Sequence, residues 1–181
     1  MFVQTDCTDL FYIDDDMEFP EDAVLRLLNH PVKVVGGAYP IKNEDEWHYA
    51  SIPKMIEGTP IGTEDGTLLR AESVAGGFIR IKRIVIEEMI KAYPETRYVE
   101  YDRESYNLFG TYIENGYLWG DDYSFCNRWK KIGGELWIDP NIDFGHIGFK
   151  TYAGNYWKYL EKLALHQKEN ENDKSIPIPS Q

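Results

Sequence analysis

The chain has 181 residues and a hydrophobic content of 43%, which suits one domain with a sizeable core and argues against disorder throughout. Its formal net charge of −12 argues against non-specific binding of nucleic acid or of an anionic membrane, since both need a basic field. Two cysteines, no secretory signal in the first residues and no apolar run of about 18 residues predict a reducing, cytoplasmic setting without a membrane span.

The first elements predict an α/β fold with a mostly parallel sheet. Residues 10–13 form a continuous apolar run, which is typical of a buried central strand. A helix is expected to open at Pro20, and a second strand to span 32–39. A strand, a helix and a strand in this order form a right-handed crossover. Because such a sheet needs more strands, we expect neighbouring strands to precede this sequence in a longer protein or to come from a partner.

A loop-rich insertion is expected at 40–75, with antiparallel strands at 47–56 and 67–74. The later expected elements are a strand at 78–82, a helix at 84–93, a short strand at 98–101, a helix at 121–132, a short strand at 136–138 and a last helix at 154–166. The folded domain is therefore expected to span 1–167, with a disordered polar tail at 168–181.

Three adjacent acids, Asp14, Asp15 and Asp16, follow the first strand directly. Ligands of open α/β sheets bind at the carboxyl ends of strands. Adjacent carboxylates repel one another, and a divalent cation together with a diphosphate would neutralise them. The alternative is an ordinary solvated acidic loop.

A second acidic pair, Asp121 and Asp122, follows Gly120 at the start of a predicted helix. Either carboxylate can cap the helix. Alternatively, one of them is a general base that takes a proton from a hydroxyl group. Both roles can hold, one for each Asp.

A third motif places His146 between Gly145 and Gly148. A neutral histidine ring nitrogen can bind a metal, and flanking glycines let the backbone approach a ligand. The alternative is an ordinary surface or core histidine. His30, His48 and His166 are expected to be of that ordinary kind.

Taken together, these segments resemble the GT-A-type glycosyltransferases, of the family-2-like sort common in bacteria and phages. The matching stretches are 11–20, 34–39, 76–78, 120–129 and 139–146, in the family's order. The resemblance implies a GT-A fold, Rossmann-like, with a mostly parallel sheet and helices on both faces. It also implies an enzyme that transfers a sugar from a UDP- or GDP-sugar to a glycan or other hydroxyl acceptor. The family leads us to expect Mn²⁺ or Mg²⁺ as the cofactor and inversion at the anomeric carbon.

The resemblance also assigns roles to residues. Asp14 and Asp16 match the family's Asp-x-Asp motif. By this match, Asp14 and Asp15 would contact the nucleotide-sugar donor. Asp16 would bind the metal ion together with Asp14. His146 matches a position that completes the metal site. The catalytic base would be Asp122, with Asp121 as second choice. The donor site would also include the residues of the cleft wall, Gly76, Gly77 and Trp119.

Two departures from the family pattern stand out. The nucleotide-binding strands that usually precede the Asp-x-Asp strand are not in this sequence, so the chain is expected to be N-terminally truncated. The acidic pair is Asp-Asp where the family usually has Glu-Asp.

Two other functions fit the same residues. One is a non-catalytic GT-A-like relic that binds carbohydrate or a protein partner, with an exposed sheet edge that would favour self-association. The other is a metal-dependent hydrolase of phosphoesters.

Overall fold

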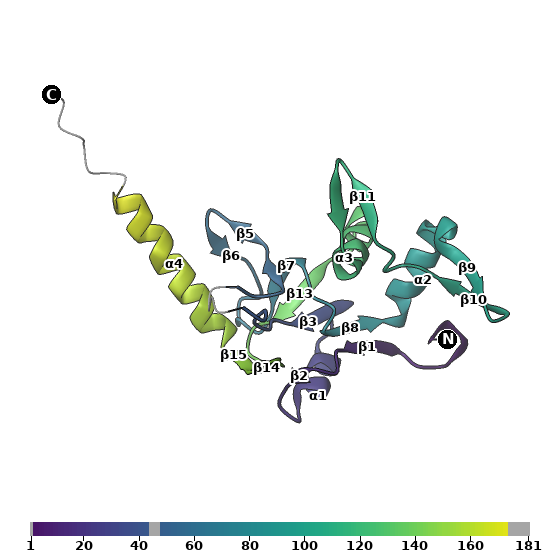
Figure 1. Cartoon of the computed structure of the whole chain (residues 1–181), viewed down its shortest axis with the longest axis horizontal. Helices are drawn as coiled ribbons and strands as arrows, with labels where there is room; N and C mark the ends of the chain where they lie inside the picture. The colour runs from purple at the N-terminus through teal and green to yellow at the C-terminus, as the bar shows by residue number, and fades with distance from the viewer. Residues whose placement is uncertain (1, 44–47, 174–181) are drawn as a thin grey trace.

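The computed structural model describes residues 2–43 and 48–173. Within them the chain forms an α/β fold around a six-stranded sheet (Figure 1). In spatial order the strands are β1 (Asp9–Ile13), β8 (Phe78–Lys82), β3 (Val34–Gly37), β13 (Leu136–Asp139), β7 (Leu69–Ser73) and β4 (Ile52–Pro53). The helices are α1 (Ala23–Asn29), α2 (Arg83–Ala92), α3 (Asp121–Lys131) and α4 (Tyr156–Asp173).

The expected mostly parallel sheet is wrong, because the six-stranded sheet is mostly antiparallel. Among its described strand pairs, only β3 with β13 is parallel. Strand β8 lies between β1 and β3 and runs antiparallel to both. Strands β1 and β3 therefore point the same way, as a crossover requires, without being neighbours. An apolar run indicates that a strand is buried, but it carries no information on which later strand will pair with it.

Strand β1 lies at an edge of the described sheet, so its expected central place is also wrong. Tyr12 is 44% exposed and Ile13 40% exposed at this edge. An edge strand offers unpaired backbone groups to another chain. Self-association through this edge stays a prediction.

Helices cover both faces of the sheet, as expected (Figure 1). Successive strand residues point to opposite faces, and the two valines of β3 follow this rule. Val34 packs in a core cluster with residues of α2 and α3, and Val35 packs in a second cluster with Leu27 of α1. The sheet is therefore the middle layer, with a core on each side.

Arg80, in the middle of β8, is fully buried and ties α1 to the sheet. Its guanidinium donates hydrogen bonds to the carbonyl oxygens of Leu27 at 3.0 Å, His30 at 2.8 Å and Val32 at 2.8 Å. These carbonyls belong to the end of α1 and the segment after it, where the usual partner four residues later is missing. Within the backbone, the Leu27 carbonyl also accepts from the N–H of His30 at 3.4 Å. Burial lowers the pKa of Arg80, and Asp9 at 3.5 Å opposes that effect.

Several expected elements are present with nearly the expected bounds. Helix α2 begins and ends one residue earlier than predicted, and α3 ends one residue earlier than predicted. The expected antiparallel pair in the insertion is β4 with β7, although Trp47 lies outside the described residues. The strand expected at 98–101 is β9 (Arg97–Glu100), paired with β10 (Arg103–Tyr106).

Other short strands were not predicted. They are β2 (Met17–Glu18), β6 (Thr59–Pro60), β11 (Tyr112–Glu114), β12 (Tyr117–Trp119), β14 (Phe144–Ile147) and β15 (Thr151–Gly154). The strand expected at 47–56 is interrupted, and its last residues form the separate strand β5 (Met55–Ile56). Strands β15, β14 and β2 form a small antiparallel sheet beside the main one. A two-residue strand such as β2 has no alternation to recognise, so only its pairing defines it.

The last helix extends further than expected. Helix α4 begins two residues after Gly154, which stays in β15, and it continues to Asp173. The expected domain boundary at 167 therefore falls inside a helix. The rest of the expected tail, 174–181, lies outside the described residues.

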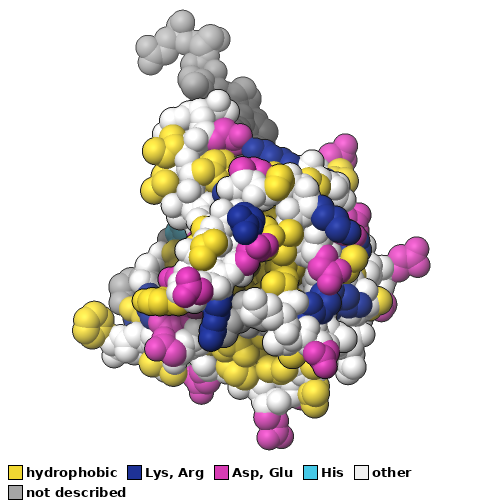
Figure 2. Space-filling model, turned by 90° about the vertical axis from the view of Figure 1, so that its right-hand side faces the viewer, with side chains coloured by type: hydrophobic (Ala, Val, Ile, Leu, Met, Phe, Trp, Pro, Cys, Tyr) yellow, Lys and Arg dark blue, Asp and Glu magenta, His cyan; other side chains and the backbone are white. Residues whose placement is uncertain are grey.

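The surface carries mixed charge. On the face shown in Figure 2, acidic side chains lie among basic and apolar ones. In the part of the chain that the structure describes, no helix has the length and apolar composition needed to cross a membrane.

Replacing the buried arginine tests its role in holding α1. Arg80→Met removes the donors to the three carbonyl groups, so we expect the free energy of unfolding to fall by about 3 kcal/mol or more. Chemical denaturation measures this change. Arg103→Met, on the exposed strand β10, is the control and should leave stability unchanged. An Arg80→Met protein as stable as the wild type would contradict this account.

Candidate active site

The turn between β1 and β2 consists of the three predicted acids, Asp14, Asp15 and Asp16. Because Ile13 pairs with Phe78, the end of β1 lies beside the start of β8. The backbone N–H of Asp14 accordingly donates to the carbonyl of Gly77 at 3.0 Å. Antiparallel pairing thus brings the acidic turn against the Gly76-Gly77 segment.

A pocket of about 220 Å³ opens at this junction. It contains five of the predicted site residues, from three separate segments of the chain. Its lining residues are Tyr12, Asp14, Tyr39, Gly76, Gly77, Phe109, Asp121 and Asp122. No Lys or Arg is among these described lining residues, so the pocket is acidic.

Asp122 is held in a defined orientation at the start of α3. Its carboxylate accepts hydrogen bonds from the backbone N–H of Tyr123 at 2.7 Å and of Gly76 at 3.3 Å. Burial raises the pKa of Asp122, and these two hydrogen bonds oppose the rise. The N-cap position of α3 belongs to Gly120. The carboxylates of Asp121 and Asp122 nevertheless accept from backbone N–H groups of the first turn, that of Asp122 at 2.9 Å and that of Tyr123 at 2.7 Å. A half-buried carboxylate of raised pKa, next to an open pocket, can act as a general base.

Tyr39 is a site residue that the sequence reasoning did not single out. Its buried hydroxyl accepts a hydrogen bond from the backbone N–H of Gly77 at 2.9 Å. Burial raises the pKa of Tyr39, and the negative charges of Asp14, Asp122 and Asp16 raise it further. Tyr39 therefore stays a neutral hydroxyl group among the acids of the site. The one sequence signal that could have indicated Tyr39 is its position at the end of the strand predicted at 32–39.

Asp16 and His146 come together although they lie 130 residues apart in sequence. His146 Nε2 lies 3.5 Å from Asp16 Oδ1. His146 Nδ1 lies 2.9 Å from the carbonyl oxygen of Pro40. Because a carbonyl only accepts, Nδ1 carries the hydrogen, and in the neutral ring Nε2 presents a lone pair toward Asp16.

Asp16 Oδ1 is buried and has no hydrogen-bond partner among the described residues. The other carboxylate oxygen pairs with Lys42, whose hydrogen bond lowers the pKa of Asp16. An unpaired carboxylate oxygen facing an imidazole lone pair fits a divalent cation. Across the described side chains, those of residues 2–43 and 48–165, no group of three or more His, Cys, Asp or Glu is arranged to hold a metal. Asp16 and His146 could therefore hold one only with further oxygen ligands from a substrate or water.

The structure separates some residues that were predicted to act together. Asp14 points into the acidic pocket, toward Gly77 and Tyr39, whereas Asp16 faces His146. Asp15 is exposed at the turn. Trp119 does not line the pocket, and its ring packs 6.4 Å from that of Tyr123.

Aromatic walls of the pocket come from other residues. Tyr12 and Phe109 line it, and their ring centroids are 4.9 Å apart. Phe109 also stacks on buried Phe125 of α3 at 4.5 Å. Aromatic rings beside carboxylates suit sugar rings, which have apolar faces and polar edges. Tyr12 and Phe109 therefore form the aromatic wall of this pocket, and Trp119 lies outside its lining.

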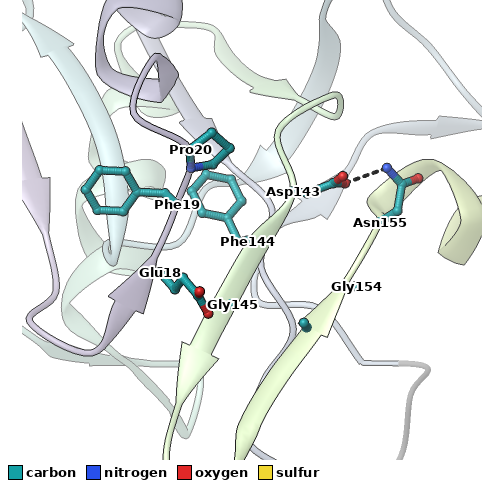
Figure 3. Close-up of a pocket in the computed structure, with 9 residues that line it drawn as sticks. Glu18, Phe19, Pro20, Asp143, Phe144, Gly145, Gly154 and Asn155 are labelled. Carbon is teal, nitrogen blue, oxygen red and sulfur yellow. Dashed lines mark hydrogen bonds between the residues drawn. The ribbon is translucent and has the colours of Figure 1, made fainter.

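A larger hollow of about 570 Å³ lies on the small sheet (Figure 3). Glu18 lies across Gly145 there, and Asn155 donates to Asp143 at 2.6 Å. Gly145 and His146 are consecutive residues of β14, so they point to opposite faces of that strand. The hollow therefore lies on the side away from the imidazole, and none of the residues predicted for catalysis, donor or metal lines it.

His30 has a structural role, as expected. Its Nε2 lies 2.8 Å from Oδ2 of the fully buried Asp139, which Arg26 also contacts at 2.6 Å. Burial raises the pKa of Asp139, but the hydrogen bonds from Arg26, His30 and Asn141 outweigh it and the net shift is downward. The cluster joins α1 to the end of β13.

Comparison with known proteins gives no family. The sequence matches no family model, and no curated protein matches it significantly. Among solved structures, one titled "Crystal Structure of A197 from STIV" is similar, with 18% sequence identity and a TM-score of 0.45. The similarity covers 79% of this chain and 59% of that one, so the chain spans less than two thirds of that structure's length.

The two glycines of the pocket offer a matched test of its packing. A Cβ atom at Gly77 would lie 2.5 Å from Tyr39 Oη and 2.8 Å from Asp14 Oδ2, whereas one at Gly76 would lie 3.5 Å from Asp122 Cβ, an ordinary contact. We expect Gly77→Ala to lower the free energy of unfolding by about 1–3 kcal/mol. Thermal or urea unfolding measures it, and Gly76→Ala should be tolerated. Equal effects of the two substitutions would contradict the close packing of Gly77.

Proposed function

We propose that this chain carries the catalytic site of a metal-dependent glycosyltransferase, which moves a sugar from a nucleotide-diphospho-sugar to an acceptor hydroxyl with inversion. The finer fold assignment, to the GT-A type, belongs to the same proposal. The observation that carries it is the convergence of Asp14, Gly76, Gly77, Asp121 and Asp122 in one pocket. These residues were selected from sequence segments up to 108 positions apart, Asp14 to Asp122.

The two parts of the site have different chemical capacities. Asp16 and His146 offer an oxygen and a nitrogen ligand suited to Mn²⁺ or Mg²⁺. Such an ion supplies positive charge that stabilises a diphosphate as it leaves. Asp122, in the neighbouring pocket, offers a carboxylate that binds a proton more readily than an exposed aspartate does, because burial raises its pKa.

The reaction proceeds as a single displacement. The acceptor oxygen forms a bond to the anomeric carbon as the bond from that carbon to the diphosphate oxygen breaks, through an oxocarbenium-like state. Asp122 takes the acceptor's proton. The N–H groups of Gly76 and Tyr123 hold its carboxylate in place during the transfer. The Tyr39 hydroxyl accepts from the Gly77 N–H and so holds this glycine in place beside Asp14. The rings of Tyr12 and Phe109 offer a wall for a sugar.

Donor binding is tested by titrating UDP and GDP into the purified chain, with and without Mn²⁺, in a calorimeter. We expect Mn²⁺-dependent binding that Asp16→Ala abolishes, because this change removes the buried carboxylate oxygen that faces His146. Asp6→Ala, which changes an exposed acid that precedes β1, at the opposite end of that strand from the turn, is the control and should bind as the wild type does. Binding that is absent, or that persists unchanged in Asp16→Ala, would contradict the proposed donor site.

The catalytic base is tested separately from binding. Asp122→Asn keeps the shape of the side chain but cannot take the proton, so we expect donor binding to persist and turnover to fall by about a hundredfold to ten-thousandfold. Release of the nucleoside diphosphate in the presence of mixed glycan acceptors is the measurement. Asp121→Asn is the matched variant and should retain more activity, since Asp121 is exposed.

If Asp122→Asn keeps full transfer activity, the assignment of the base is wrong. Cleavage of phosphoesters without any sugar acceptor would point instead to a hydrolase, and carbohydrate binding without turnover to a non-catalytic protein.

A further inference from the structure

Lys42 contacts the predicted metal-binding carboxylate from a segment to which the sequence reasoning gave no role. Its Nζ pairs with Asp16 Oδ2, on the opposite oxygen from the one that faces His146. A Cβ atom at Gly148 would lie only 3.3 Å from Lys42 Cδ, so the lysine stem passes close to that glycine. The same short segment contains Pro40, whose carbonyl oxygen accepts from His146. Residues 40–42 therefore supply both the group that orients the imidazole and a cation for Asp16.

The contact places two positive charges in competition for one carboxylate. A divalent cation held by Asp16 and His146 would lie close to the Lys42 ammonium, and like charges at such a distance repel. The ammonium is partly exposed and sits on a flexible stem of four carbons, so it can leave Asp16 at small cost. When it leaves, it stays within reach of whatever the metal binds.

The site has few other cations for an anionic substrate. The described residues lining the neighbouring pocket include three aspartates, Asp14, Asp121 and Asp122, and no Lys or Arg. The chain as a whole has a net charge of −12. A diphosphate therefore needs positive charge beyond that of the metal, and an ammonium group that has just left a carboxylate can donate to phosphate oxygens.

We infer that Lys42 is a diphosphate-binding residue, which neutralises Asp16 before the metal binds and moves to the phosphate oxygens of the donor afterwards. The inference rests on the proposed function, since it names a group that contacts the donor at the same site. It predicts effects of opposite sign when the ammonium is removed. Metal binding alone should strengthen, and diphosphate binding should weaken.

The experiment is a pair of calorimetric titrations on Lys42→Ala and the wild type. With Mn²⁺ alone, Lys42→Ala should bind up to about fivefold more tightly, the value of an exposed ion pair that no longer competes. With UDP added at saturating Mn²⁺, the same variant should bind about tenfold or more weakly, because a charge-assisted hydrogen bond to phosphate is lost. Lys42→Arg should recover most of the UDP affinity.

Lys54→Ala, a lysine from the other side of the insertion, is the matched control and should match the wild type in both titrations. Identical affinities of Lys42→Ala and the wild type, in a protein that does bind Mn²⁺ and UDP, would overturn the role of Lys42 and leave the proposed function standing. A wild type that binds neither ligand would overturn both. Weaker binding of Mn²⁺ itself in Lys42→Ala would show that the lysine supports the metal site and would also overturn the inference.

Discussion

The antiparallel pairing of β1 with β8 is the constraint on which the site depends. It sets the end of β1, where the acids begin, directly beside the start of β8, where the two glycines lie. If β8 ran parallel to β1, the end of β8 and not its start would lie beside the end of β1. Because β8 also pairs with β3, the same register brings Tyr39 near Gly77. One strand pairing thus gathers segments that are far apart in the chain.

Glycine is needed at position 77 for a steric reason. Tyr39 Oη and Asp14 Oδ2 both approach the place where a Cβ atom would be. A larger residue would displace the Tyr39 hydroxyl, which accepts from the Gly77 N–H, and the Asp14 carboxylate, which lines the pocket. Gly76, by contrast, serves through its backbone N–H to Asp122, which any residue except proline could provide.

Charge divides the site into two parts with different needs. The pocket of Asp14, Asp121 and Asp122 has no cation among its described lining residues, and burial raises the pKa of Asp122 there. At Asp16, the nearby Lys42 has the reverse effect and lowers the pKa of the carboxyl group. The two carboxylates thereby shift in opposite directions: the pKa of Asp122 is raised and that of Asp16 is lowered. Their environments, and not their residue type, make the difference.

The sequence by itself determined the local elements and most of the candidate site. Periodicity and end signals located α2 and α3 within one residue. The acidic motifs indicated Asp14 and Asp122, and the family resemblance indicated Gly76 and Gly77, which all line one pocket. Only the tertiary structure decided strand order and direction, because apolar content reports that a strand is buried and not which strand pairs with it. It also decided that Tyr39, Tyr12, Phe109 and Lys42 belong to the site. Such residues resemble ordinary core or surface positions in sequence, and only long-range contacts place them beside the acids.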